Sequence, residues 1–257
     1  MKGVLLAGGT GSRLMPLTKA TNKSLLPMGR QTIVEHVLDT LLSSGAIEDV
    51  MVISGPEHFG QLAQLLGSGD EHDCRLTYRV QDKANGIAAA LGMCEDFVGH
   101  DKFVVILGDN IFEDNKAIAS KIVEFEHSDD EYGLFVHEVP DPQRFGVVAY
   151  GPSGEILDIV EKPKDPPSRD AVLGLYMYTP AVFRVIRKLQ PSARGEYEIS
   201  DVNSFMVKHR DGRAHRVECG WVDAGTHESY ERATEMMRRK LLNEDVALVK
   251  AVTKEFK

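Results

Sequence analysis

Residues Gly3–Arg13, GVLLAGGTGSR, are the most informative segment for the fold of this chain. It opens with Gly3–Ala7, an apolar run too short for a helix and typical of a buried strand. Three glycines follow at once, namely Gly8, Gly9 and Gly11. Glycine lets a backbone turn tightly and present several N–H groups to one anion. A strand followed by such a loop indicates an α/β domain in which the loop binds phosphate.

Ser12 and Arg13 complete the loop with a hydroxyl donor and a fixed planar cation whose geometry suits phosphate. The loop lacks the Gly-Lys-Ser/Thr of a P-loop. Leu14 stands where a dinucleotide-binding loop has its third glycine, and Ser54–Pro56, after the second predicted strand, offers no acid for a ribose. Both features count against a nicotinamide-dependent enzyme. A plain strand-to-loop turn remains the alternative for the loop taken alone.

Four apolar runs alternate with four amphipathic stretches over residues 1–130. The runs predict strands at Gly3–Ala7, Val50–Ser54, Leu76–Val80 and Lys102–Leu107. The amphipathic stretches predict helices at Thr32–Ser44, His58–Leu66, Gly86–Phe97 and Asn115–Phe125. Such a repeat predicts an α/β fold with a mostly parallel sheet and helices on both faces.

The pattern changes after residue 130. Shorter strands, separated by turns with proline and glycine, are predicted at Tyr132–Val139, Gly146–Tyr150, Ile156–Glu161, Val172–Tyr178 and Ala214–Cys219. Helices are predicted at Pro180–Leu189, Glu198–His209 and Thr226–Leu242. We expect this half to extend the first sheet as a smaller β-rich part, and residues 244–257 to form a weak helix or a frayed tail.

Candidate functional residues follow the ends of predicted strands. The loop Gly8–Arg13 follows the first strand, Gln81 the third and Asp109 the fourth. In parallel sheets, ligands bind beyond the carboxyl ends of the strands. We therefore expect these residues to lie on one rim of the sheet.

The chain is acidic, with 30 Lys and Arg against 39 Asp and Glu and a formal net charge of −9. Such a chain repels DNA, RNA and anionic membranes, so we expect no nucleic acid and no membrane as a partner. No apolar run approaches the roughly 18 residues that a spanning helix needs. If the ligand is a polyanion, the chain must bind it in a local basic pocket.

The cysteines and histidines show no pattern of a metal or disulfide site. The three cysteines are far apart and form no CxxC pair, and the nine histidines form no HxH or HExxH. This argues against a disulfide framework and against a zinc or other transition-metal site. The apolar stretch at the N-terminus is too short for a signal peptide. We expect a reduced, cytoplasmic protein.

Seven motifs are spread along nearly the whole chain. They are Gly8–Leu14 with Pro16–Thr18 and Asn22–Pro27; Gln81 with Gly86–Ala88; Leu107–Phe112; Phe145–Val148; Val160–Pro163; Arg194–Asn203; and Trp221–Ser229. In this order the chain resembles the sugar-1-phosphate nucleotidyltransferases, and most of all their glucose-1-phosphate thymidylyltransferase branch. The resemblance implies one Rossmann-like domain, residues 1–243, with a nucleotide-binding half (1–130), a sugar-binding half (131–243) and the 244–257 tail.

The resemblance implies Mg²⁺-dependent transfer of a nucleotidyl group from dTTP to glucose 1-phosphate, giving dTDP-glucose and pyrophosphate. Because both substrates are anionic, charge repulsion and positioning dominate the barrier, and cations supply most of the catalysis. Mg²⁺ prefers one or two carboxylates together with phosphate oxygens and water. The motifs imply Asp109 and Asp223 as these carboxylates. The alternative for each is a capping or turn aspartate, and without the resemblance this alternative would be the better interpretation of Asp109.

The resemblance also assigns the remaining site residues. The implied catalytic cations are Arg13, Lys23 and Lys162. The implied nucleotide site comprises Gly8, Gly9, Gly11, Ser12, Arg13, Gln81, Gly86 and Asp109, with Gln81 reading the base. The implied sugar-phosphate site comprises Gly146, Glu161, Lys162, Val172 and Arg194, with Glu161 accepting from sugar hydroxyls. The alternatives are ordinary surface charge for Lys162 and Arg194, and a salt bridge to Lys162 for Glu161.

The chain departs from the family pattern at four positions near the substrates. Ala84 replaces a proline beside the base, Ala89 a glutamine, Phe145 a tyrosine and Leu173 a threonine. These changes leave UTP, or another sugar 1-phosphate, as alternative substrates. A catalytically silent sugar-nucleotide regulator would lack phosphate or metal residues, and none is lost. Relatives of this kind imply a homo-oligomer, either a dimer or a tetramer.

Overall fold

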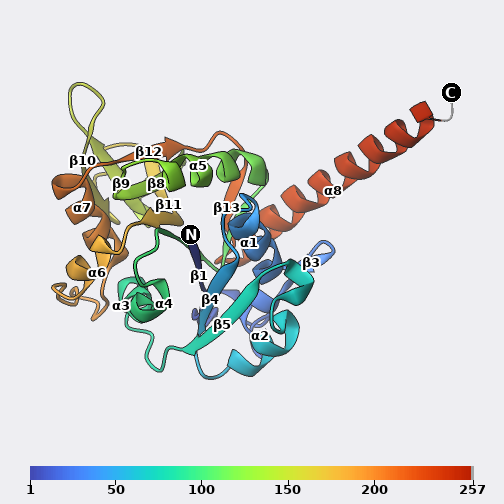
Figure 1. Ribbon diagram of the computed structural model, residues 1–257, viewed down its shortest axis with the longest axis horizontal. Coiled ribbons are helices and arrows are strands. Elements are labelled where there is room, and N and C mark those ends of the chain that lie inside the picture. The colour runs from blue at the N-terminus through green and yellow to red at the C-terminus, as the bar shows by residue number, and fades with distance from the viewer. Residues whose placement is uncertain (256–257) are drawn as a thin grey trace.

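The first predicted strand is β1 (Lys2–Leu6), which lies inside a nine-stranded sheet (Figure 1). In the computed structural model, which describes residues 1–255, β1 pairs in parallel with β4 (Asp49–Ser54) and with β6 (Phe103–Leu107). β5 (Arg75–Val80) pairs in parallel with β4. These four strands therefore end at the same edge of the sheet, which brings the loop after β1, Gln81 and Asp109 to one rim.

The second half of the chain continues this sheet through β11 (Asp170–Tyr178), which is buried along its length and runs antiparallel to β6. β11 also pairs with β8 (Tyr132–Glu138) and, at Ala171, with β9 (Gly146–Tyr150). β10 (Ile156–Glu161) pairs with β9, and β12 (Gly212–Arg216) with β8. The expected α/β fold with a β-rich extension is confirmed.

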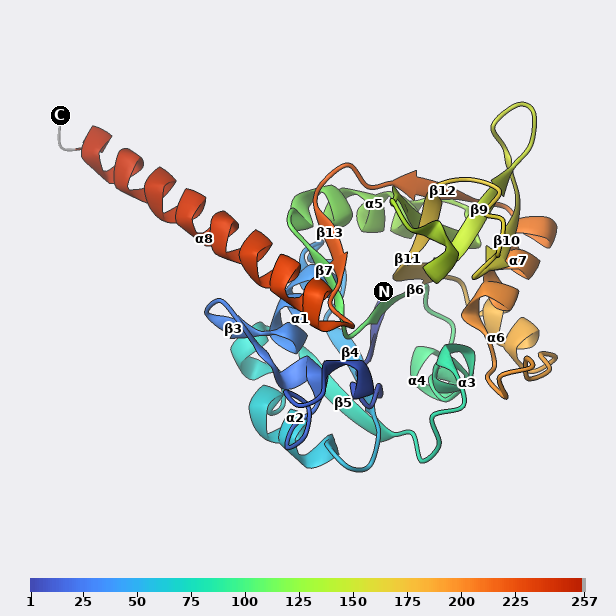
Figure 2. The same cartoon turned by 180° about the vertical axis from the view of Figure 1, so that it is seen from behind.

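Two hydrophobic cores cover the two faces of the sheet, because side chains alternate along each strand. Leu5 belongs to one core, and Val4 and Leu6 to the other. The helices α1 (Ile33–Leu42), α2 (Phe59–Leu66), α5 (Asn115–His127) and α8 (His227–Glu255) contribute to the Leu5 core. The helices α3 (Ile87–Gly92), α4 (Glu95–Val98), α6 (Ala181–Ile186) and α7 (Ile199–His209) contribute side chains to the other core (Figures 1 and 2).

The predicted helix over Gly86–Phe97 is broken in the structure into α3 and α4. The guanidinium of Arg79 donates to the carbonyl of Met93 at 2.7 Å. In an unbroken helix this carbonyl would accept from an N–H one turn later. The break therefore coincides with a tertiary contact that the helical pattern does not contain.

Several short elements escaped the sequence prediction. β7 (Asn110–Phe112) pairs with β13 (Trp221–Asp223), and β2 (Pro27–Met28) with β3 (Gln31–Thr32). Within residues 1–255 there are also four 3₁₀ turns, namely η1 (Ser12–Leu14), η2 (Lys23–Leu25), η3 (Asp70–His72) and η4 (Pro142–Arg144). The strand expected at Ala214–Cys219 is β12, which starts and ends earlier because it pairs with β8 over residues 212–216.

The last helix continues beyond its predicted end at Leu242. α8 runs from His227 to Glu255, and most of it projects from the rest of the molecule (Figures 1 and 2). Of the expected tail, residues 256–257 lie outside the described residues. No helix within residues 1–255 has the length and apolar character needed to cross a lipid bilayer.

Candidate active site

Side chains from the following segment hold the glycine-rich loop after β1. Asn22 is buried, and its Nδ2 donates to the carbonyls of Ala7 at 3.3 Å and Gly9 at 3.5 Å. The Thr18 hydroxyl donates to the carbonyl of Gly11 at 2.7 Å. Gly11 has a φ of +65°, and a Cβ on it would lie 2.8 Å from Thr18 Cγ2. The position therefore requires glycine, and the loop has a defined shape before any ligand binds.

Lys23 and Asp109 form an ion pair beyond the ends of β1 and β6. Lys23 begins the turn η2, where the Asn22 side chain accepts from the N–H of Ser24 at 2.8 Å. Lys23 Nζ donates to Asp109 Oδ2, and Asn110 Nδ2 donates to Asp109 Oδ1 at 3.0 Å. Burial acts to raise the pKa of Asp109, but Lys23 outweighs it and holds this pKa below the usual carboxyl range. Asp109 is therefore a buried and firmly ionised carboxylate.

The two-stranded ribbon of β7 and β13 brings Asp223 to Asp109. Asp223 pairs with Asn110 across the ribbon, and the N–H of Ala224 donates to the carbonyl of Asp109 at 2.8 Å. Asp223 Oδ1 is buried and has no hydrogen-bond partner among the described residues. Burial and the charge of Asp109 raise the pKa of Asp223 to about 6. The site therefore contains an acceptor oxygen that still lacks a donor or a cation.

Arg13 lies close to Asp223. A Cβ on Gly225 would lie 2.9 Å from Arg13 Nη2 and 2.7 Å from Asp223 Oδ1, so the two side chains flank the same glycine. The charge of Arg13 adds to the lowering of the pKa of Asp109 and partly offsets the rise at Asp223. Arg13, Lys23, Asp109 and Asp223 form what we call the charged cluster, drawn from four segments of the chain.

A cavity of about 350 Å³, the loop-side cavity, lies against the charged cluster. Of the residues implied for the nucleotide and the catalytic cations, it is lined by Gly8, Gly9, Arg13, Lys23, Gln81, Gly86 and Asp109. Gln81 Nε2 donates to Asn85 Oδ1 at 3.2 Å and to the carbonyl of Gly86 at 3.4 Å. Gly11 and Ser12 are not among the described residues that line this cavity; they form its supporting turn.

A second cavity, of about 260 Å³, lies toward the β-rich half, and we call it the sheet-side cavity. It is lined by all the residues implied for the sugar phosphate, namely Gly146, Glu161, Lys162, Val172 and Arg194. Lys162 Nζ lies 2.9 Å from Glu161 Oε1, and Arg194 Nη2 lies 3.4 Å from the same oxygen. The alternative interpretation of Glu161 as a salt-bridge partner of Lys162 thus also holds. Glu198, bonded to Arg194 at 2.8 Å, raises the pKa of Arg194.

The two cavities adjoin at the charged cluster. Arg13 and Asp109 line both cavities, together with Ile87, Leu107 and Glu196. Groups from two ligands, one in each cavity, would therefore meet beside a guanidinium and a carboxylate. Holding two anionic groups together among fixed charges is the requirement for joining them.

The sequence model of one family, described as nucleotidyl transferase, matches residues 2–240. The chain belongs to the nucleotidyl transferase family. The members of this family are enzymes, and this chain is a nucleotidyltransferase. The identification agrees with the arrangement of two cavities around the charged cluster.

The similar curated proteins include two that illustrate the range of this nucleotidyltransferase's relatives. The low-salt glycan biosynthesis nucleotidyltransferase Agl11 of Haloferax volcanii is 39% identical over 240 residues, which cover 92% of this chain and 66% of Agl11. The glucose-1-phosphate thymidylyltransferase of Neisseria meningitidis serogroup A is 36% identical over 240 residues, which cover 93% of this chain and 83% of the relative. The chain thus spans about two thirds of the first and most of the second.

Solved structures share the fold of this nucleotidyltransferase. A crystal structure of a candidate glucose-1-phosphate thymidylyltransferase from Bacillus anthracis, in complex with sucrose, is 49% identical with a TM-score of 0.87. The match covers 93% of this chain and 95% of that one. A UDP-glucose pyrophosphorylase with UDP-glucose has a TM-score of 0.82 at 24% identity, over 93% and 98% of the two chains. At that identity the likeness concerns the fold alone.

The sequence reasoning missed several groups beside the charged cluster. The rings of Phe145 and Trp221 meet edge to face with 5.6 Å between their centroids, and both line the sheet-side cavity. Asn110 and Glu198 line it as well. All four residues lie in the motifs that carried the resemblance, and Asn110 directly follows Asp109. The sequence therefore showed these positions but not their contacts. Phe145 was noted there as a departure from the family pattern.

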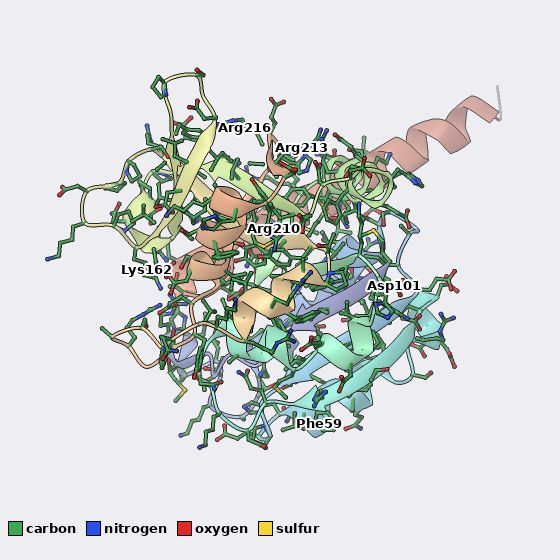
Figure 3. The ribbon with its side chains drawn as sticks, turned by 60° about the vertical axis from the view of Figure 1, so that its left-hand side comes forward. Phe59, Asp101, Lys162, Arg210, Arg213 and Arg216 are labelled. Atoms are coloured by element: carbon green, nitrogen blue, oxygen red, sulfur yellow. The ribbon has the colours of Figure 1, made fainter. Side chains whose placement is uncertain are left out.

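Basic residues also gather away from the site. Arg210, Arg213 and Arg216 lie around the end of α7 and β12, apart from Lys162 (Figure 3). Each of the three forms an ion pair with an acidic side chain, respectively Glu131, Asp130 and Asp170. These arginines are engaged in ion pairs, and none of the three lines either of the two cavities.

Proposed function

We propose that the chain catalyses Mg²⁺-dependent transfer of a thymidylyl group from dTTP to glucose 1-phosphate, giving dTDP-glucose and pyrophosphate. The observation that carries this proposal is the junction of the two cavities at Arg13 and Asp109. The glycine-rich loop suits a triphosphate, and the sheet-side cavity combines cations for a phosphate with a carboxylate for hydroxyls. The thymidylyltransferase name of the Neisseria relative supports the choice of substrates.

Charge and position account for the chemistry. A phosphate oxygen of glucose 1-phosphate attacks the α-phosphorus of dTTP, and a new P–O bond forms while the bond to the bridging oxygen breaks. Pyrophosphate leaves with the electron pair. The attacking phosphate is already ionised near pH 7, so no general base is required. Arg13 and Lys23 would balance the charge on the triphosphate, while Lys162 and Arg194 would hold the sugar phosphate.

Glu161 and Gln81 would set the orientation of the two substrates. Glu161 lies at the end of β10 with Lys162 and Arg194 on its Oε1, and its carboxylate can accept from hexose hydroxyls. Gln81 presents a primary amide to the loop-side cavity, which can donate to and accept from a pyrimidine edge. These groups would place the attacking oxygen near the α-phosphorus.

Asp109 and Asp223 would hold the Mg²⁺. The donor set fits this ion, because both residues offer hard oxygens and Asp223 Oδ1 has no partner among the described residues. No group of three or more His, Cys, Asp or Glu gathers as a metal site in the described part of the chain, so two carboxylates and substrate phosphates are the fitting set. Bound there, the ion would supply positive charge to the reacting phosphates. Lys23 would then exchange Asp109 for a phosphate oxygen.

Pyrophosphate release tests the proposal directly. The assay uses glucose 1-phosphate with dTTP, UTP, ATP, CTP or GTP, each with Mg²⁺ or with EDTA. We expect release with dTTP several-fold above UTP, and none in EDTA. Equal or greater release with UTP would overturn the choice of base and retain the chemistry. If no pyrophosphate were released with any nucleotide, either with glucose 1-phosphate or with other sugar 1-phosphates, the result would favour a regulator that only binds its ligand.

The same assay includes a matched pair of lysine variants. Lys162 and Lys208 are similarly exposed, at 45% and 44%, and each pairs with a carboxylate. Lys162→Ala should lower kcat/KM for the sugar phosphate about 10- to 100-fold. This is the loss expected when one hydrogen bond to a charged group is removed. Lys208→Ala should match the unmodified chain. If the two variants changed kcat/KM equally, this would contradict the proposal that the sugar phosphate binds beside Lys162 in the sheet-side cavity.

A further inference from the structure

The side chain of Asn110 connects three elements at the charged cluster. It lies at the start of β7 and its residue is only 3% exposed. Asn110 Oδ1 accepts from the backbone N–H of Gly174, in β11, at 2.9 Å. The same oxygen accepts from Trp221 Nε1, in β13, at 2.9 Å. Nδ2 donates to Asp109 Oδ1 at 3.0 Å.

These partners fix the orientation of the amide. A backbone N–H and an indole N–H can only donate, so the amide oxygen must face Gly174 and Trp221. The NH₂ group must then face Asp109. A Cβ on Gly174 would lie 2.4 Å from Asn110 Nδ2, so the strand leaves no room for the amide to move toward it. The donor to Asp109 is therefore locked by the surrounding fold.

The two oxygens of Asp109 consequently have different partners. Oδ2 bonds to Lys23, a flexible side chain that the proposed reaction requires to turn toward a phosphate. Oδ1 bonds to Asn110, which is held in place by two other strands. When Lys23 moves, Asn110 is the group that still holds the rotation of the carboxylate.

We propose that Asn110 is a positioning residue, which fixes the Asp109 carboxylate for the cation and joins it through Trp221 to the wall of the sheet-side cavity. This inference rests on the proposed role of Asp109. Partners of this kind, which orient a metal ligand, change metal affinity or activity by about 10- to 100-fold when they are removed.

The test measures binding of Mn²⁺, as a substitute for Mg²⁺, from the electron paramagnetic resonance signal of the free ion. Mn²⁺ is added first alone and then with dTTP, and each signal is compared with that of the same mixture without protein. Asn110→Ala removes the donor to Asp109. Trp221→Phe removes the indole N–H together with part of the ring, and keeps an aromatic ring in the wall. It serves if Asn110→Ala fails to fold. Asn115→Ala is the matched control, because the Asn115 amide also has a buried partner, Thr40, but does not line either cavity.

We expect the Kd for Mn²⁺ to rise about 10-fold in Asn110→Ala and several-fold in Trp221→Phe. The KM for Mg²⁺ should rise in parallel, while the KM for dTTP at saturating metal should change less than about twofold. A fall in Tm with unchanged metal affinity in both variants would overturn the inference and leave Asn110 with a packing role. An unmodified chain that binds no Mn²⁺, either alone or together with dTTP, would overturn the metal role of Asp109, and this inference with it.

Discussion

Asp109 and Asp223 lie in the same cluster, yet their pKa values move in opposite directions. Both are buried, which disfavours the ionised form. Asp109 has the Lys23 ammonium on one oxygen, and this contact outweighs burial. Asp223 has no hydrogen-bond partner for Oδ1 in the described chain, and the charge of Asp109 adds to the effect of burial. The ionised form of Asp223 is therefore electrostatically unfavourable in the fold, and a bound cation would stabilise it.

This electrostatic cost predicts how stability depends on pH. The pKa of Asp223 is about 6 in the fold and 3.8 ordinarily, so the folded chain binds a proton more tightly than the unfolded chain. The free energy of unfolding should therefore rise as the pH falls through 6, and the cost should be complete above pH 7. Asp223→Asn removes the charge. In EDTA at pH 7.5 it should raise stability by on the order of 1 kcal/mol, roughly 2–4 °C in Tm.

Other groups titrate in the same range, so the informative quantity is the difference in Tm between the two proteins. This difference should shrink as the pH is lowered from 7.5 toward 4, as followed by differential scanning calorimetry. The variant should also lose most turnover in the pyrophosphate assay. A difference that stays constant with pH would argue against the raised pKa, and an active variant would contradict the metal role of Asp223.

At the residue scale, the sequence allowed the members of the site to be predicted but not their contacts. Arg13, Lys23, Asp109 and Asp223 were named from motifs, and the structure brings them together in one cluster. The bond from Asn110 to Asp109 and the missing partner of Asp223 could not be predicted. Both depend on the register of β7 against β13, which no local pattern encodes.

At the element scale, predictability depended on length. The strands β1, β4 and β6 are mostly buried runs of five or six residues, long enough to appear as apolar segments. β5 has six residues that alternate between exposed and half-buried, which is also a recognisable strand pattern. The ribbon strands β7 and β13 have three residues each, too few for a period of two to be recognised. Tertiary pairing alone makes them strands, and they are the elements that carry Asp223 to Asp109.

The start of α3 contacts the loop at residues 194–198, which is another place where the two halves meet. Gly86 has a φ of +111°, and a Cβ on it would lie 2.4 Å from the carbonyl oxygen of Tyr197. The N–H of Tyr197 donates to the carbonyl of Asn85 at 2.8 Å. Gly86→Ala should therefore push the loop that carries Arg194 away from α3. We expect kcat/KM to fall at least about 10-fold for both substrates, with a loss of about 1–3 kcal/mol in stability.

Gly99→Ala is the control for this prediction. Gly99 has a φ of +60°, but a Cβ there meets no atom within 4 Å in the described part of the chain. Gly99→Ala should lose about 1 kcal/mol of stability through backbone strain, with no effect on turnover. Initial rates with each substrate varied, together with Tm, separate strain from displacement. If both variants kept full activity, the contact at Gly86 would have no role in shaping the cavities.

At the scale of the whole molecule, the net charge of −9 conflicts with the binding of two anions. The site resolves the conflict by pairing its cations with carboxylates that have a second role. Lys23 pairs with Asp109, a proposed metal ligand, and Lys162 pairs with Glu161, a proposed acceptor of hydroxyls. Substrate binding would thus exchange partners within the site, so that no cation has to be buried alone.

The projecting helix α8 leads to a proposal on assembly. Its first turns pack on the body, and Arg30 reaches Asp245 at 2.9 Å. Leu242 and Val246, one turn apart on the same side of the helix, are 54% and 52% exposed. A single helix of this length that projects into water has little to stabilise it. We propose that a second copy of the chain covers this face and makes a homodimer or a larger homo-oligomer.

Light scattering after size-exclusion chromatography measures the assembly. We expect the unmodified chain to have at least twice the mass of one copy, and Leu242→Glu with Val246→Glu to shift it to the monomer. Neither change removes a buried side chain. We therefore expect the monomeric variant to remain folded and to unfold in a cooperative transition with a measurable Tm. Leu157→Glu is the control, since Leu157 is 49% exposed on β10. A monomeric unmodified chain, or dissociation by Leu157→Glu alone, would contradict assembly through α8.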